Sequence, residues 1–137
     1  LERINLKPEN YIDLDWIVPA PAQGAVVEVA VANDDFCRQA LAKLNHSEKE
    51  ICTHIEREFL RALERGCTAP IEALATFSSD KIDFEGVLFS LDGKEKHTIK
   101  KSCTFDSYKN FGKNCAEEIL NNGGSALMES IRRDLKK

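Results

Sequence analysis

The stretch LERGCTAPI, residues 63–71, marks the point at which this chain changes from helix to sheet. Before it, apolar side chains recur at helical spacing, and after it they alternate with polar ones. Gly66 is suited to end the helix because glycine adopts a positive φ at low cost, and Pro70 prevents a return to helix. The turn between them presents Cys67 on short, constrained backbone, which makes this thiol a candidate attachment point.

The alternating pattern beyond this turn predicts three strands, over residues 71–77, 82–91 and 96–105. The first two are joined by Ser-Ser-Asp at residues 78–80. The second and third are joined across Asp-Gly at residues 92–93, a strong hairpin signal. The spacing therefore predicts a compact antiparallel sheet.

Helices flank this sheet on both sides in the sequence. The helix before it begins at Ser47, which forms a predicted capping box with Glu50. Two more helices close the chain, the first capped near Asp106 or Ser107. Within the second strand, Gly86 predicts a bulge. The chain from residue 47 onward is thus expected to be an α+β domain, a three-stranded sheet packed with helices.

The residues before this domain follow a different pattern. Residues 1–17 are irregular and are interpreted as a connector. The run Ala25–Ala32 is almost wholly small or β-branched, which predicts a strand buried on both faces. A helix capped near Asn33 or Asp34 follows it. Because a doubly buried strand needs neighbours on both sides, this strand-helix segment is expected to belong to a separate layer.

Composition excludes several classes of function. The net charge of −4 over 137 residues argues against nucleic-acid binding, and no apolar run approaches the length of a membrane span. The five cysteines show no CxxC spacing, so reduced thiols in a cytoplasmic protein are expected. Three of them, Cys37, Cys52 and Cys115, lie in apolar helical stripes and are interpreted as structural, as is Cys103 in a predicted strand.

Several stretches together resemble porphobilinogen deaminase, also called hydroxymethylbilane synthase. They share the order and spacing of that family along nearly the whole chain, and they are PAPAQGA (19–25), LNH (44–46), EREFL (56–60), LERGCTAPI (63–71) and AEEILNNG (116–123). Any one of these motifs is weak evidence, but the series is specific. The chain is therefore similar to the C-terminal part of this family.

The resemblance implies a division of the chain. The family enzyme has three domains and is more than twice this length. Residues 1–17 would connect from the missing second domain, 18–46 would return to the first domain, and 47–137 would form the C-terminal cofactor-attachment domain. The implied activity condenses four porphobilinogen units into a linear tetrapyrrole with release of ammonia. The missing domains would be partners of this chain, and the chain alone is expected to be inactive.

The resemblance also implies a site. Cys67, after Gly66, would hold a dipyrromethane cofactor through a thioether, since a thiolate adds readily to an electrophilic methylene carbon. Because each pyrrole ring carries carboxylates, Arg57 is a candidate partner for them. Gln23 in the Gln-Gly-Ala stretch is expected to face the cleft. We expect the fragment by itself to lack the cofactor.

Two alternatives remain open. Val29 and Val31 stand where the family commonly has a glutamate and an arginine, which favours a stand-alone binding module without catalysis. A cysteine-dependent enzyme of another class would pair Cys67 with His54 or His46. Residues 1–46, if separated from their sheet, are also expected to be disordered or to pair between chains through the Ala25–Ala32 strand.

Overall fold

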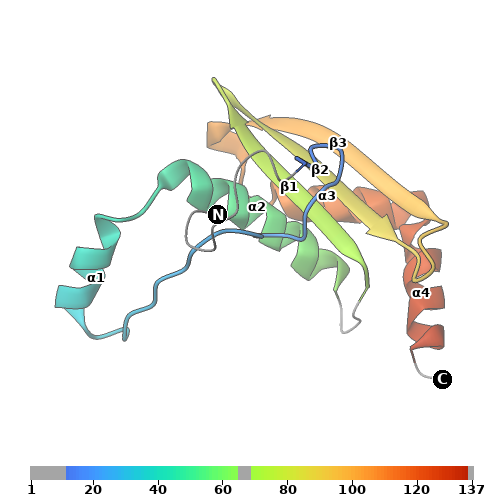
Figure 1. Ribbon diagram of the computed structural model, residues 1–137, viewed down its shortest axis with the longest axis horizontal. Coiled ribbons are helices and arrows are strands. Elements are labelled where there is room, and N and C mark those ends of the chain that lie inside the picture. Colours follow the sequence, from blue (N-terminus) through green and yellow to red (C-terminus); the bar gives the residue numbers. More distant parts are fainter. Residues whose placement is uncertain (1–11, 65–68, 136–137) are drawn as a thin grey trace.

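The computed structural model describes residues 12–64 and 69–135 (Figure 1). The elements in chain order are α1 (Asp35–Ala42), α2 (Ser47–Leu63), β1 (Ile71–Ser78), β2 (Lys81–Phe89), β3 (Lys96–Thr104), the short turn η3 (Phe105–Ser107), α3 (Phe111–Ile119), the kinked connection η4 (Leu120–Gly124) and α4 (Ser125–Asp134). Each described helix is too short or too polar to cross a bilayer.

The three strands form one antiparallel sheet in the order β1-β2-β3. Gly86 at the centre of β2 lies opposite Ala73 on one side and Ile99 on the other. This confirms the predicted α+β fold and all three predicted strands, whose ends differ from the prediction by one or two residues. The alternation of apolar and polar residues was sufficient to predict these strands, because one face of the sheet is buried and the other is not.

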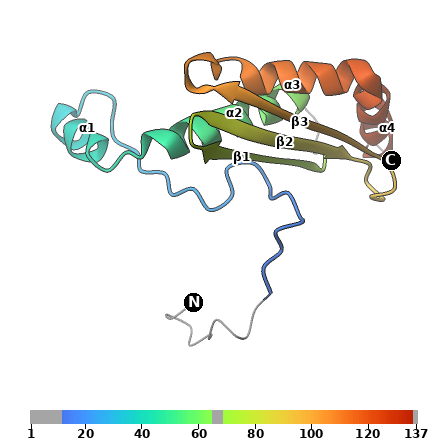
Figure 2. The same cartoon turned by 90° about the horizontal axis from the view of Figure 1, so that it is seen from above.

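Helices α2 and α3 cover the same face of this sheet. The ring of Phe84 on β2 contacts Phe59 of α2 and Phe111 of α3, with centroid distances of 5.2 and 6.2 Å. Phe59 is fully buried, and burial of such a side chain contributes about 1.5–3 kcal/mol. Figure 2 shows α4 beside one end of the sheet, and both views place α1 at the opposite end of the molecule.

The predicted bulge at Gly86 is wrong. The register runs through this residue without interruption. A Cβ atom here would lie 2.5 Å from Cζ of Phe59, so the absence of a side chain makes room for that ring. The glycine therefore serves the packing of α2 on the sheet rather than a change in strand geometry.

Helix α2 begins at Ser47 as predicted, but its predicted capping box and the predicted start of α3 are wrong. No side-chain cap is found at the start of α2, where Glu50 accepts a hydrogen bond from the Asn45 amide (2.6 Å) instead of forming a capping box. Asp106 lies in η3, and α3 begins only after Asn110, whose N–H donates to Glu58 Oε1 (3.0 Å). A carboxylate from α2 thus replaces the local cap that the sequence predicted.

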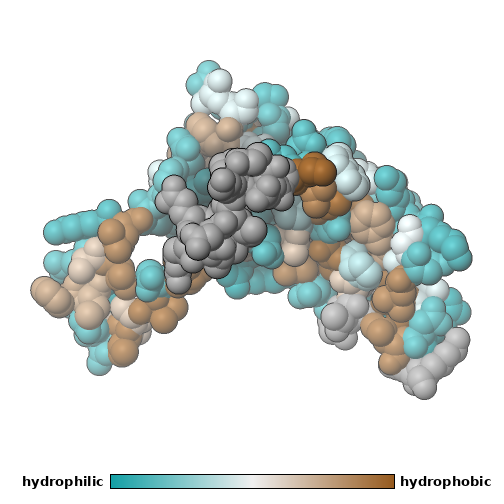
Figure 3. Space-filling view, in the orientation of Figure 1, coloured by the Kyte–Doolittle hydropathy of each residue, from teal (hydrophilic) through white to brown (hydrophobic). Residues whose placement is uncertain are grey.

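The Ala25–Ala32 run pairs with no strand in the described part of the chain. The predicted strand Ala25–Ala32 is wrong for this chain, because these residues form extended coil and Val26 is 88% exposed. The predicted helix after it is present as α1, where Asp34 accepts from the Cys37 N–H (2.9 Å), but α1 buries no residue and Phe36 is 82% exposed. Figure 3 shows apolar side chains at the surface over α1.

Candidate functional site

Two of the four residues predicted to bind the cofactor, Gln23 and Arg57, meet at a groove. It has a volume of about 720 Å³ and is bounded by residues 22–28, the start of α2 and the middle of β1. Gln23 and Arg57 both line it. In Figure 1 the coil that contains Gln23 passes α2 and β1 before it leads away to α1. The fold therefore brings together two site residues that are 34 positions apart in the sequence.

Glu56 forms part of the groove wall and is 5% exposed. Its Oε2 accepts from the Ala22 N–H (2.7 Å), and its Oε1 accepts from the Ala75 N–H (2.8 Å). Burial raises the pKa of Glu56, and the hydrogen bonds from Ala75 and Ala22 oppose that shift. Glu56 was not among the residues predicted from the sequence to form the site. The available signal was an acidic side chain within the apolar stripe of α2, which marks a buried and partnered carboxylate.

The PAPAQGA stretch also closes the outer edge of β1. The Ala73 N–H donates to the Pro19 carbonyl (3.0 Å), next to the Ala75 N–H that donates to Glu56. These two donors face away from β2, where an unpaired edge strand would otherwise present them to solvent. The segment that carries Gln23 is therefore fixed to the sheet through backbone contacts.

Arg57 is exposed, and no described carboxylate forms an ion pair with it. Lys49 adds a second cation to the groove, whereas Glu28, Glu50 and Glu56 line it with carboxylates. Of these three, Glu50 and Glu56 already accept hydrogen bonds from the protein. Among the described residues, the guanidinium of Arg57 therefore lies at the groove with no carboxylate in an ion pair with it.

Gly66 and Cys67 lie outside the described residues, in the connection between α2 and β1. The helix ends at Leu63, where the N–H of Glu64 donates to the Leu60 carbonyl (2.8 Å). Six residues of helix separate Arg57 from Leu63, about 9 Å along the axis. The candidate attachment residue therefore follows the C-terminal end of α2, while the groove flanks its N-terminal part.

His54 lies outside the groove lining and has its own partners. Its Nε2 is 3.0 Å from Glu58 Oε1, and its ring packs edge-on against Tyr108 at 5.5 Å. His46 does line the groove. The pairing of either histidine with Cys67 stays a prediction, since Cys67 is outside the described part of the chain.

The four described cysteines are free thiols. Cys52 and Cys115 are buried and Cys103 is partly buried, as a structural role requires, but Cys37 is exposed because α1 has no partner. Burial raises the pKa of Cys115 to about 11, so this thiol is protonated and unreactive at neutral pH. In the described part of the chain, no cluster of three metal-binding side chains occurs.

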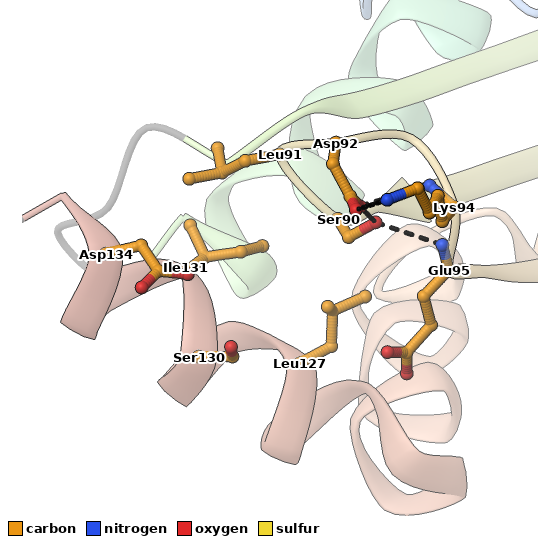
Figure 4. A pocket seen from close by; sticks show the side chains of 9 residues that line it. All are labelled: Ser90, Leu91, Asp92, Lys94, Glu95, Leu127, Ser130, Ile131 and Asp134. Atoms are coloured by element: carbon orange, nitrogen blue, oxygen red, sulfur yellow. Dashed lines mark hydrogen bonds and ion pairs between the residues drawn. The ribbon is translucent and has the colours of Figure 1, made fainter.

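A second cavity, of about 440 Å³, lies between the β2–β3 loop and α4 (Figure 4). Ser90 donates to Asp92 Oδ1 (2.7 Å) and accepts from the Glu95 N–H (3.0 Å), which orders the loop. Leu127 and Ile131 form its apolar side. None of the predicted site residues in the described part of the chain lines this cavity.

Comparisons with known proteins agree with the resemblance. The family model described as "Porphobilinogen deaminase, C-terminal domain" matches residues 50–121, more than half of the chain. Relatives named porphobilinogen deaminase include those of Syntrophomonas wolfei (28% identity, over 90% of this chain and 40% of the relative), Carboxydothermus hydrogenoformans (32%, over 93% and 41%) and Chloroherpeton thalassium (36%, over 90% and 40%).

The chain spans about two-fifths of the length of these relatives. The match includes α2, the whole sheet and α3, together with the connection that carries Cys67. It therefore covers the sheet and the two helices that pack on it. This chain belongs to the porphobilinogen deaminase family, and its residues 50–121 correspond to the C-terminal domain of that family.

Proposed function

We propose that this chain is the C-terminal part of a porphobilinogen deaminase, a transferase of porphyrin and heme biosynthesis. The whole enzyme would condense four porphobilinogen units into hydroxymethylbilane and release ammonia at each step. The observation that carries this proposal is the family match over residues 50–121, a range that includes Gly66 and Cys67. The cytoplasm is the expected location, since the chain carries free thiols.

In this proposal Cys67 holds a dipyrromethane through a thioether. The bound dipyrromethane supplies the primer to which pyrrole units are added. The residues present fit such a group, because the groove offers Arg57 and Lys49 to its acidic side chains. Gln23 offers a side-chain amide at the same groove.

The role of Cys67 depends on its thiolate. Because the C-terminal end of a helix carries partial negative charge, the end of α2 disfavours ionisation of a nearby thiol. Arg57, Arg65 or residues of the missing domains would have to supply the compensating positive charge. Among the described cysteines, the buried pair Cys52 and Cys115 have raised pKa values and fit a structural role.

The exposed N-terminal region supports the proposed domain assignment. Residues 1–17 would connect from the second domain and 18–46 would return to the first, which leaves 47–137 as the cofactor domain. The valines between residues 26 and 31 and the apolar face of α1 are exposed here. They would be covered by the missing domains, so we expect the isolated chain to carry no cofactor and to form no tetrapyrrole.

A stand-alone ligand-binding or interaction module is the second candidate. Val29 and Val31 replace the glutamate and arginine common in the family, and both side chains are exposed. The loss of that arginine removes one contact for an acidic substrate. A module of this kind would keep the fold and the groove but not the chemistry.

The test uses the full-length protein from its natural source, incubated with porphobilinogen. Cys67→Ser should reduce hydroxymethylbilane formation to background, because serine cannot form the thioether. Cys37→Ser is the matched control, since Cys37 is an exposed cysteine on α1, and it should retain the parent rate. A Cys67→Ser protein that keeps the parent rate would contradict the assignment, and an inactive parent would favour the binding module.

A further inference from the structure

Glu56 is the one buried charged side chain among the described residues. A buried carboxylate is costly unless hydrogen bonds compensate for the lost water. Both of its oxygens are compensated by backbone N–H groups from different parts of the chain, Ala22 at 2.7 Å and Ala75 at 2.8 Å. The carboxylate therefore bridges α2, β1 and the segment before α1.

The turn that Glu56 holds is strained. Ala22 has a φ of 59°, in the left-handed region that residues with a side chain seldom adopt. Such a conformation persists where surrounding contacts hold it. The N–H of this same residue donates to Glu56, and the turn is closed by weaker hydrogen bonds from Gln23 N to Ala20 O (3.1 Å) and from Ala25 N to Ala22 O (3.3 Å).

The hydrogen bond between Ala22 and Glu56 joins the neighbours of both predicted site residues. Gln23 follows Ala22, and Arg57 follows Glu56, and both line the groove. This hydrogen bond ties the stretch to α2, whereas the Pro19 carbonyl ties it to β1 through the Ala73 N–H. The placement of Gln23 at the groove is therefore linked to the carboxylate of Glu56.

We propose that Glu56 is a positioning residue, whose carboxylate fixes the Pro19–Gly24 turn and so places Gln23 in the groove beside Arg57. This role rests on the proposed function as far as catalysis is concerned. Its structural part stands on the contacts of Glu56 alone. Glu56 does not touch the reacting atoms in this proposal, and it acts through Gln23.

The first experiment measures hydrogen exchange of the 137-residue chain by mass spectrometry. Glu56→Gln keeps the size of the side chain but turns an NH₂ group toward one of the two N–H donors. Exchange in the peptide 19–25 should become about tenfold faster or more, because a hydrogen bond to a charged acceptor is lost. Unchanged exchange in this peptide would overturn the proposal.

Glu58→Gln is the matched control, since Glu58 lies on the same helix but bonds to Asn110 and His54. Hydrogen exchange of the peptide 19–25 in Glu58→Gln should be as slow as in the parent chain. Protection of residues 82–89 in β2 reports whether each variant is folded. If Glu56→Gln does not fold, Glu56→Met, which keeps the buried volume without a charge, replaces it in the same comparison.

The second experiment measures kcat and KM of the full-length protein with porphobilinogen. Glu56→Gln and Gln23→Ala should each raise KM more than they lower kcat. The KM of the double variant should differ from that of Glu56→Gln by no more than about twofold. The reason is that Glu56→Gln has already displaced Gln23, so removing its side chain has little further effect. Additive effects would overturn the positioning role. A parent that forms no hydroxymethylbilane would refute the proposed function, while hydrogen exchange would still decide the role of Glu56.

Discussion

The sheet domain and the segment before it carry the same kinds of sequence signal with opposite results. In residues 47–135 the apolar faces of helices and strands are buried against one another. In residues 12–46, α1 buries nothing and the valines of the Ala25–Ala32 run are exposed. An amphipathic helix or a β-branched run indicates that a segment needs a partner, and it does not indicate that the partner lies in the same chain.

The two regions are joined at the Pro19–Gly24 turn. Pro19 accepts from β1, and Ala22 donates to Glu56 of α2. This junction is polar, whereas the core of the sheet domain is apolar. Because of this contrast, we expect the same type of substitution to change the stability of the fold by very different amounts in the two regions.

The largest difference is expected for phenylalanine. Phe59→Ala should lower the free energy of unfolding by about 3–5 kcal/mol, because the ring is fully buried between α2 and β2. Phe36→Ala on α1 should change it by less than about 0.5 kcal/mol. Urea unfolding of both variants measures the difference, and equal losses would show that α1 belongs to the same cooperative core.

A smaller difference is expected for glycine. Gly112→Ala should cost about 1–3 kcal/mol, because its Cβ would lie 2.0 Å from the Ile55 carbonyl oxygen, where α2 and α3 meet. In Gly24→Ala the added Cβ would have no atom within 4 Å, but Gly24 has a φ of +77°, which is strained for alanine. That strain is confined to the turn. The urea midpoint of the sheet domain should move for the first variant and stay in place for the second.

Self-association of the exposed Ala25–Ala32 run stays a prediction. If this run pairs between chains, Val29→Lys should weaken the association, because a charge on an edge strand opposes pairing. Sedimentation velocity over a range of concentrations measures this. A monomer in which residues 25–32 are protected from hydrogen exchange would contradict the prediction.

The smallest effect is expected at the β2–β3 loop, as the pH falls. Hydrogen bonds from Ser90, followed by those from Lys94, lower the pKa of Asp92 to about 2. The pKa of Asp92 in the folded protein lies below its ordinary value of 3.8. The contribution of Asp92 to folding stability is therefore present above pH 3.8 and is lost as the pH falls toward 2. NMR shifts of the Ser90 and Lys94 amides should titrate in that range. Asp92→Asn should abolish the titration, and a midpoint near 3.8 in the parent would contradict the expected shift.

The sequence predicted the three strands well because they follow one another in the chain and each pairs with its neighbour in sequence. The alternation after Pro70 and the turn residues were enough to find β1, β2 and β3. The apolar, β-branched run at Ala25–Ala32 wrongly predicted a strand, because strand formation depends on neighbouring strands that this chain does not supply. The capping box predicted from Ser47 and Glu50 was also wrong, because no side-chain cap is found at the start of α2.

The candidate site was predicted in part. Gln23 and Arg57 were named from their motifs, and both line the groove. Glu56 was missed because the sequence shows its charge but not its two backbone donors, which come from distant residues. A tertiary contact of this kind leaves only a weak signal, an acidic residue on an apolar helix face.

The intact mass and peptide map of the full-length protein from its natural source would test most directly whether Cys67 is the cofactor attachment residue. We expect a dipyrromethane adduct on the peptide that contains Cys67, together with formation of hydroxymethylbilane. An active protein with an unmodified Cys67 would contradict this assignment.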